Sequence, residues 1–342
     1  MEWNWKSNSF VAAARIAMAC RFEIIAVDEG HVDIHAVLER ALDEVEQLEA
    51  QLNPFVAESH ISDINKRAHC EPVKVEPQLY QLLKRAVEIG LESGGAFDIT
   101  VGAFTLPRKR RRHFTSIERS WEHFGINNDT KPLIGLQLLH LDDETMTVRF
   151  LQEGIMLDPC GIAKGYAVDS IVSCLRREGL RNFFVHAGKS SIYASGALPH
   201  FNGWLVGITN PKEPSRRLAV LEVNDIAIGV SEWYDNFACG RRLHIFDPRT
   251  QSSTGSQMVL RAYAICRSAT DADALSTAFL LLGCEGVKTY CERHHEVGAI
   301  LVYQSGGAVQ IKAYGIATAF MQKAESSSRT ALTNAPLAEL PN

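Results

Sequence analysis

The sequence predicts an α+β fold rather than a doubly wound parallel sheet. Two observations carry this prediction. Amphipathic helical patterns occupy the first half of the chain, and strand patterns follow one another in the second half without a helix between each pair. The 342 residues are enough for one large domain with possible subdomains.

Three segments have the residue pattern of helices. Residues 37–52 repeat apolar side chains on one face opposite glutamates, and the Asn-Pro pair that follows ends the pattern. A second segment begins near Pro77 and ends at Gly94 and Gly95, which are typical of a helix start and a helix end. A third is expected to follow Gly165 and to run to about Gly179.

Strand patterns dominate the second half of the chain. They are runs rich in branched and aromatic residues, bounded by glycine or polar turn residues. The segment after Arg21 also has strand character. The other predicted strands cover residues 181–188, 204–210, 218–230, 258–266 and 297–304.

The composition excludes several classes of protein. A net charge of −5 argues against general binding to nucleic acid or to a membrane surface, and no apolar run reaches the roughly 20 residues of a transmembrane segment. The N-terminal apolar stretch is broken by Arg15 and Arg21, unlike a signal peptide. Eight cysteines without metal-ligand spacing are typical of buried thiols, so we expect a cytoplasmic protein.

The stretch "DPCGIAKGYAVD", residues 158–169, places two glycines directly before a predicted helix. One interpretation is structural, because Gly161 and Gly165 permit backbone angles that other residues resist. The other interpretation is a ligand. Glycines let a phosphate approach the backbone, and a helix N-terminus offers free N–H groups.

A second stretch, "ATDADALSTAF", carries Asp271, Asp273 and Thr277 at the start of another predicted helix. Asp273 and Thr277 are four residues apart, so they lie on one helix face. A carboxylate and a hydroxyl there form a hard-oxygen pair that suits Mg²⁺. Alternatively, Asp271 or Asp273 caps the helix, which is the common role of aspartate near a helix start.

A third stretch, "RRLHIFDPRTQSSTGS", contains His244 shortly before Asp247 and Pro248. The Asp-Pro pair is a turn former, so we expect Asp247 to shape a turn. A single histidine is more often structural than catalytic. The interest of His244 comes from the glycine turn and the candidate metal pair elsewhere in the chain.

In this order, the three stretches resemble the ApbE family of FAD:protein FMN transferases. Further segments that resemble the family are "AMACRFEI", "LNPFVAESHISDIN", "SGGAFDITVG" and "FFVHAGKSSIYASG", so that the resemblance covers about residues 15–305. It implies an ApbE-like fold with mostly antiparallel sheets and packed helices. We expect an N-terminal segment over 1–14, the flavin transferase domain over 15–320 and a disordered tail over 321–342.

The resemblance also implies a reaction. A Thr or Ser hydroxyl of a client flavoprotein attacks the pyrophosphate of FAD, and FMN stays on the client while AMP leaves. Two alternatives remain open from the sequence. One is a hydrolase that gives free FMN and AMP, and the other is a flavin-binding protein without catalysis.

By resemblance, Mg²⁺ is held by Asp273, Thr277 and the backbone carbonyl of Ala163. Candidate catalytic residues are His244, as the base for the client hydroxyl or as an orienting group, and Ser231, in the phosphate pocket. The residues at FAD-contact positions are Met18, Phe55, Ala96, Phe97, Asp98, Cys160, Gly161, Tyr166, His244 and Ile245.

The chain departs from the family pattern at several positions. Cys160 is a poorer hydrogen-bonding group than serine, and Phe55 keeps the stacking face of tyrosine but loses its hydroxyl. Lys189, Glu232 and Gln251 each replace a glycine of the family pattern. The last two lie near the expected reaction centre, so they are the main argument for a protein that binds flavin without turnover.

Five consecutive basic residues, 108–112, form a separate feature. The plain interpretation is a solvated loop. The alternative is a positive patch that attracts an acidic client or the FAD phosphates.

Overall fold

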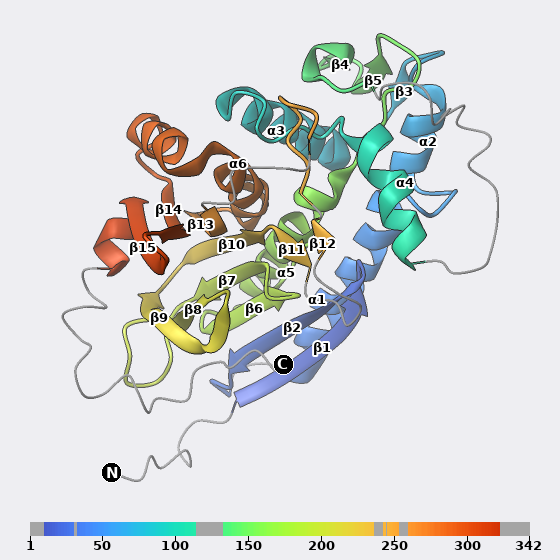
Figure 1. Cartoon of the computed structure of the whole chain (residues 1–342). Coiled ribbons are helices and arrows are strands. Elements are labelled where there is room, and N and C mark those ends of the chain that lie inside the picture. The colour runs from blue at the N-terminus through green and yellow to red at the C-terminus, as the bar shows by residue number, and fades with distance from the viewer. Residues whose placement is uncertain are drawn as a thin grey trace. The chain divides into compact units, whose positions relative to one another are not determined.

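The computed structural model describes two compact units (Figure 1), each of which contains more than one segment of the chain. Unit 1 comprises Met1–Glu46, Lys164–Ile245 and Ser256–Asn342, and unit 2 comprises Gln47–Ala163 and Phe246–Gly255. Within these units the structure describes residues 10–30, 33–113, 133–235, 242–243, 245–252 and 259–321.

Unit 1 is built on an eight-stranded sheet in which every neighbouring pair of strands is antiparallel. The predicted α+β class with antiparallel sheets is therefore confirmed. The strands, in their order across the sheet, are β1 (Phe10–Ala17), β2 (Cys20–Val27), β6 (Phe183–Ala187), β7 (Ser191–Ser195), β10 (Ile226–Glu232), β13 (Val259–Cys266), β14 (Gly298–Ser305) and β15 (Ala308–Gly315).

The two faces of this sheet are covered differently. On one face, side chains such as Phe184 and Ile228 form a core with the hairpin of β8 (Trp204–Asn210) and β9 (Glu213–Val223). The opposite face packs against α5 (Ala163–Arg177) and α6 (Ala269–Arg293) (Figure 1). Because side chains alternate along a strand, Ser191 and Gly229 point to the helical face.

Unit 2 is mainly helical, with a small antiparallel sheet. The helix α1 (Ile34–Leu52) begins in unit 1 and ends in unit 2. Among the described residues, the other elements of unit 2 are α2 (His60–Arg67), β3 (Val73–Lys74), α3 (Pro77–Glu92), α4 (Gly102–His113), η3 (Leu136–Leu138), β4 (Leu139–Asp142), β5 (Thr147–Phe150) and η4 (Pro159–Gly161).

Three of the predicted helices are confirmed as α1, α3 and α5, with boundaries close to those expected, and the helix predicted to carry Asp273 is α6. The predicted strand over 218–230 is wrong, because it is two strands, β9 and β10, which lie in different sheets. Asp225, with a positive φ of 50°, forms the turn between them. The loop expected at residues 108–112 is also wrong, since these residues belong to α4, which continues to His113.

The first turns of α6 contact the backbone of two other elements. A Cβ atom on Gly229 of β10 would overlap the carbonyl group of Ala272 and lie 2.8 Å from the nitrogen of Asp273. A Cβ atom on Gly165 of α5 would overlap the carbonyl group of Ala269 and lie 2.8 Å from Cβ of Asp273. Both positions therefore require glycine, because backbone atoms cannot move aside as the end of a flexible side chain can.

We predict that Gly229→Ala lowers the free energy of unfolding by about 3 kcal/mol, because the added methyl group forces β10 and α6 apart. The control is Gly306→Ala in the β14–β15 turn, where a Cβ atom meets nothing within 4 Å but φ is +56°. Its expected cost is about 1 kcal/mol of backbone strain. Urea denaturation measures both, and equal losses would contradict the close-packing argument.

Candidate active site

Asp273 lies in the second turn of α6 and is almost completely buried, with 3% of its surface exposed. The helix is capped by Ser268, whose side chain accepts a hydrogen bond from the backbone N–H of Asp271. The alternative that Asp271 or Asp273 caps this helix is therefore wrong. Asp273 is a buried carboxylate that needs another explanation.

Three groups of unit 1 contact the Asp273 carboxylate. The Ser191 hydroxyl donates to Oδ1 at 2.8 Å, and the backbone N–H of Gly165 donates to Oδ2 at 3.0 Å. The Lys164 ammonium lies 3.5 Å from Oδ2. The carboxylate is thus fixed by β7 and by the first turn of α5. Ser191 has no counterpart among the residues expected from the sequence.

Thr277 lies one turn after Asp273 and belongs to a group of hydroxyls. Ser231 of β10 places its Oγ 3.1 Å from Thr277 Oγ1 and 2.8 Å from Ser276 Oγ. Two of the predicted site residues are thereby brought into direct contact. We call Lys164, Ser191, Ser231, Asp273 and Thr277 the aspartate cluster.

Asp169 connects the glycine stretch to α6, a role that the sequence did not indicate. Its carboxylate accepts hydrogen bonds from the N–H groups of Ala269 and Thr270 at 2.8 and 2.9 Å, and from the hydroxyls of Ser268 and Thr270 at 2.7 and 2.6 Å. A negative charge at a helix N-terminus is favourable. Asp169 therefore fixes the start of α6, and with it the position of Asp273.

Two hairpin turns lie at the end of the sheet where β7 begins. Met18 and Ala19, between β1 and β2, both have positive φ, as do Gly188 and Lys189 between β6 and β7. The turns are neighbours, since the Gly188 N–H donates to the Arg21 carbonyl at 2.9 Å. Met18 is half-buried at this end. Lys189, with φ of 69°, keeps the left-handed backbone expected of the glycine that it replaces.

Unit 2 contains the first part of the glycine stretch. Asp158 caps the short helix η4 by accepting a hydrogen bond from the N–H of Cys160 at 3.0 Å, and it also accepts one from the Thr105 hydroxyl. Gly161 follows, and a Cβ atom there would lie 3.2 Å from Cε2 of Phe97. The two glycines thus have different roles, because Gly165 contacts α6 and Gly161 faces an aromatic ring.

The predicted FAD contacts at Ala96, Phe97 and Asp98 are 1%, 5% and 8% exposed. Asp98 accepts hydrogen bonds from the N–H and the hydroxyl of Thr100 at 2.7 and 2.6 Å. Burial raises the pKa of Asp98, and the bonds from Thr100 oppose this effect. Phe55 packs beside Ala103, Leu106 and Met156.

Three further residues were predicted to contact FAD, namely Tyr166, His244 and Ile245. In α5, Tyr166 is half-buried, and burial raises the pKa of its hydroxyl, as does the charge of Asp169, so it stays a hydrogen-bond donor at neutral pH. Ile245 is buried. His244 lies outside the described residues. Asp247 accepts bonds from the N–H and the guanidinium of Arg249 at 2.8 to 3.0 Å, which fits the expected role in a turn.

The departure at Glu232 does not add a charge to the aspartate cluster. Glu232 is the neighbour of Ser231 on β10, so its side chain points to the opposite face of the sheet. There it forms an ion pair with Arg261 at 2.7 Å, and Arg261 also donates to the Thr209 hydroxyl at 2.8 Å. Gln251, with φ of 53°, keeps the left-handed backbone expected of a glycine.

The oxygen atoms of the aspartate cluster suit a hard cation. Asp273 and Thr277 offer oxygen ligands, and the Asp273 carboxylate has acceptor capacity beyond its bonds to Ser191 and Gly165. Ala163, whose carbonyl is the third predicted ligand, directly precedes Lys164 in the chain. Within the described ranges no group of three or more His, Cys, Asp or Glu residues could hold a metal ion, so a cation at Asp273 would be bound by this one carboxylate together with hydroxyl and carbonyl oxygens.

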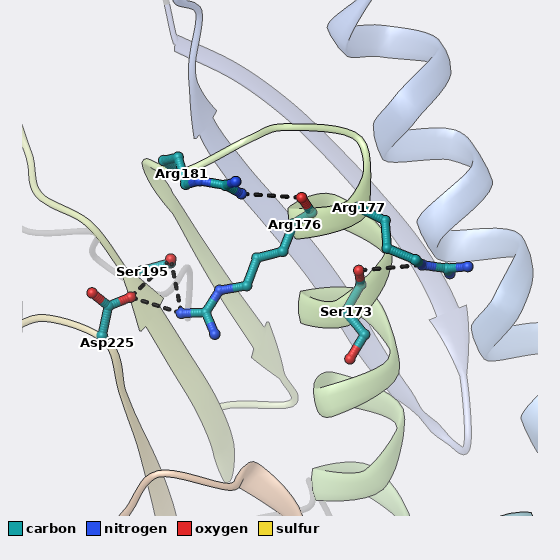
Figure 2. Close-up of a pocket in the computed structure, with 6 residues that line it drawn as sticks. All are labelled: Ser173, Arg176, Arg177, Arg181, Ser195 and Asp225. Carbon is teal, nitrogen blue, oxygen red and sulfur yellow. Dashed lines mark hydrogen bonds and ion pairs between the residues drawn. The ribbon is translucent and has the colours of Figure 1, made fainter.

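A hollow on the surface of unit 1 lies at the C-terminal end of β7, beside Ser195 (Figure 2). Its arginines are engaged in the fold, because Arg176 pairs with Asp225 at 2.7 Å, Arg177 with Glu44 at 3.0 Å, and Arg181 donates to the Arg176 carbonyl at 3.0 Å. Cations near a helix C-terminus stabilise it. The hollow is lined by Ser173, Arg176, Arg177, Arg181, Ser195 and Asp225.

Comparison with known proteins identifies the family. The sequence model of the ApbE family matches residues 18–301. This chain belongs to the ApbE family. This chain is 28% identical over 313 residues to the FAD:protein FMN transferase of Treponema pallidum, a match that covers 84% of this chain and 82% of that protein. The protein of the same name from Chlamydia muridarum is 27% identical over 257 residues, with 70% and 73% covered.

Solved structures confirm the ApbE fold. The flavin transferase ApbE of Vibrio cholerae superposes with a TM-score of 0.77 at 21% identity, and the match covers 92% of this chain and 99% of that one. An ApbE protein from Thermotoga maritima has a TM-score of 0.74 at 23% identity, with the same coverage. In the described part of this chain no helix is long and apolar enough to cross a membrane.

We predict that Gly161→Val weakens FAD binding at least tenfold, about 1.4 kcal/mol, because the branched side chain displaces Phe97, a predicted contact of the flavin nucleotide. The matched control is Gly161→Ala. Its single methyl group needs the ring to move by only a few tenths of an ångström, so its affinity for FAD is expected to change less than threefold. Calorimetric FAD titration measures both. Wild-type affinity in Gly161→Val would show that the glycine serves the fold alone.

Proposed function

We propose that this protein transfers FMN from FAD to a Thr or Ser hydroxyl of a client flavoprotein, in a Mg²⁺-dependent reaction that releases AMP. The observation that carries the proposal is the aspartate cluster, in which the buried Asp273 and the half-buried Thr277 are held by hydrogen bonds from β7, β10 and α5. The relatives named FAD:protein FMN transferase support the same reaction.

In this proposal the ion is held by Asp273, Thr277 and the carbonyl of Ala163. When bound, the ion neutralises charge on the pyrophosphate of FAD and on the leaving AMP. The residues around it hold its ligands in place. Ser191 and the N–H of Gly165 orient the carboxylate, and Ser231 orients the Thr277 hydroxyl. Such a site needs little reorganisation during the reaction.

The bond changes define the remaining roles. The client oxygen forms a bond to the FMN phosphorus, the bridging P–O bond to AMP breaks, and the hydroxyl proton must leave the attacking oxygen. We assign this proton to His244. The flavin nucleotide is bound by the FAD-contact positions named above, of which Gly161 and Phe97 are neighbours in unit 2.

Glu232 and Gln251 are the main argument for a flavin-binding protein without turnover. The contacts of Glu232 weaken that argument, because its carboxylate pairs with Arg261 on the face of the sheet opposite Ser231. Transfer and hydrolysis differ in the acceptor. FMN attached to a client supports the transferase, and free FMN supports the hydrolase.

We also propose a cytoplasmic location. No disulfide joins two cysteines of the described ranges, and Cys174, Cys266 and Cys291 are buried, which is typical of a reducing compartment. Cell fractionation that finds the mature protein outside the cytoplasm with native disulfides would contradict this location.

We predict that Asp273→Ala abolishes AMP release while the protein still folds and binds FAD more weakly. The ion stabilises the transition state more than bound FAD, so turnover suffers more than affinity. Thr277→Ala should retain part of the activity, since a neutral hydroxyl binds the ion less firmly than a carboxylate. AMP release and FAD affinity are measured across a Mg²⁺ titration.

The control for this series is Asp271→Ala. It removes a carboxylate from the first turn of the same helix, outside the aspartate cluster, and is expected to keep wild-type turnover. Equal, Mg²⁺-independent AMP release by wild type and Asp273→Ala would overturn the metal assignment.

A further inference from the structure

We infer that Lys164 is the counter-ion of Asp273 in the metal-free protein and leaves this carboxylate when the metal binds. Lys164 thereby makes metal binding depend on FAD. The inference rests on the proposed function, because it assumes that Asp273 holds the catalytic ion. Lys164 is thus a positioning residue, which acts on the metal through its contact with Asp273.

The burial of Asp273 is the first argument. Its side chain is 5% exposed, and its two hydrogen-bond donors, Ser191 and the Gly165 N–H, carry no charge. A buried carboxylate without a countercharge is costly. Among the ion pairs of the described residues, only the one with Lys164 supplies that countercharge, at 3.5 Å from Oδ2.

The second argument is competition for the same oxygens. Lys164 and Gly165 both approach Oδ2, and Ser191 approaches Oδ1. An ammonium ion and a divalent cation within about 4 Å of one carboxylate repel each other, and this repulsion is strong where water is excluded. The metal therefore binds at the cost of the Lys164–Asp273 contact.

The third argument is where the ammonium goes. The Lys164 side chain is 23% exposed and has a flexible four-carbon stem, so it can turn away from Asp273 without a change in the helix. FAD brings two negative phosphates to the metal and offers the displaced ammonium a new partner. These phosphates stabilise the displaced ammonium, so Lys164 opposes metal binding less in the FAD complex than in the free protein.

The test measures Mn²⁺ affinity from the EPR signal of the free ion, with and without FAD. We expect Lys164→Met to bind Mn²⁺ about tenfold more tightly than wild type in the absence of FAD, because the competing cation is gone. The factor by which FAD raises Mn²⁺ affinity should fall by the same amount. Lys164→Arg keeps the charge and should keep most of the wild-type coupling.

The matched control is Lys189→Met, which removes an exposed lysine from the turn between β6 and β7. It is expected to bind Mn²⁺ like wild type, which separates the contact with Asp273 from a general loss of positive charge. Thermal unfolding provides a second readout. Lys164→Met, and Lys164→Gln if the first variant folds poorly, should have a lower melting temperature that Mn²⁺ raises more than in wild type.

The outcomes separate this inference from the proposed function. If Lys164→Met has wild-type Mn²⁺ affinity with and without FAD, the inference is wrong, while AMP release by wild type with FAD and Mg²⁺ still supports the proposed function. If wild type neither binds Mn²⁺ in the presence of FAD nor releases AMP, both are wrong.

Discussion

The contact of the first turns of α6 with two glycines is the constraint on which the rest of unit 1 depends. Gly229 of β10 and Gly165 of α5 let the helix backbone approach so closely that any side chain there would overlap a carbonyl group of α6. Asp169 holds the same helix end through its N–H groups. Strand, helix and helix are therefore fixed to one another at the residues that carry the candidate metal ligands.

This close packing buries a charged group. Packing Asp273 between α5, β7 and β10 removes its carboxylate from water, and two neutral donors and one ammonium ion compensate for the lost hydration. In the proposed metal site the same burial would strengthen binding, because a divalent cation interacts more strongly with a carboxylate where water is excluded. Under this assignment, the stability of the free protein and its affinity for the metal are opposed at Asp273, and the proposed exchange of Lys164 connects the two.

The sequence was sufficient for much of this organisation. The spacing of Asp273 and Thr277 predicted a shared helix face, and the strand runs predicted the class of fold. Contacts between segments far apart in the sequence were not predictable. Ser191 lies 82 residues from Asp273, and no local pattern marks a serine at the start of a strand as its partner. Asp169 looked like one end of a glycine stretch, although its carboxylate accepts hydrogen bonds from the first N–H groups of α6, which begins 100 residues later. The strand pattern over 218–230 concealed a turn, because Asp225 adopts a left-handed backbone within an apolar run.

The departures from the family pattern lie where the backbone or a neighbouring side chain accommodates them. At Lys189 and Gln251 the side chain has changed, but φ remains positive, so the turns keep their form at the expense of some strain. At Glu232 the new carboxylate lies on the face of the sheet that packs against β8, where Arg261 and Thr209 are available to it. Changes were accommodated where the backbone tolerates them or where the opposite face supplies a partner. At Gly165 and Gly229 neither condition holds, since the neighbour is the backbone of α6 itself, and only glycine fits there.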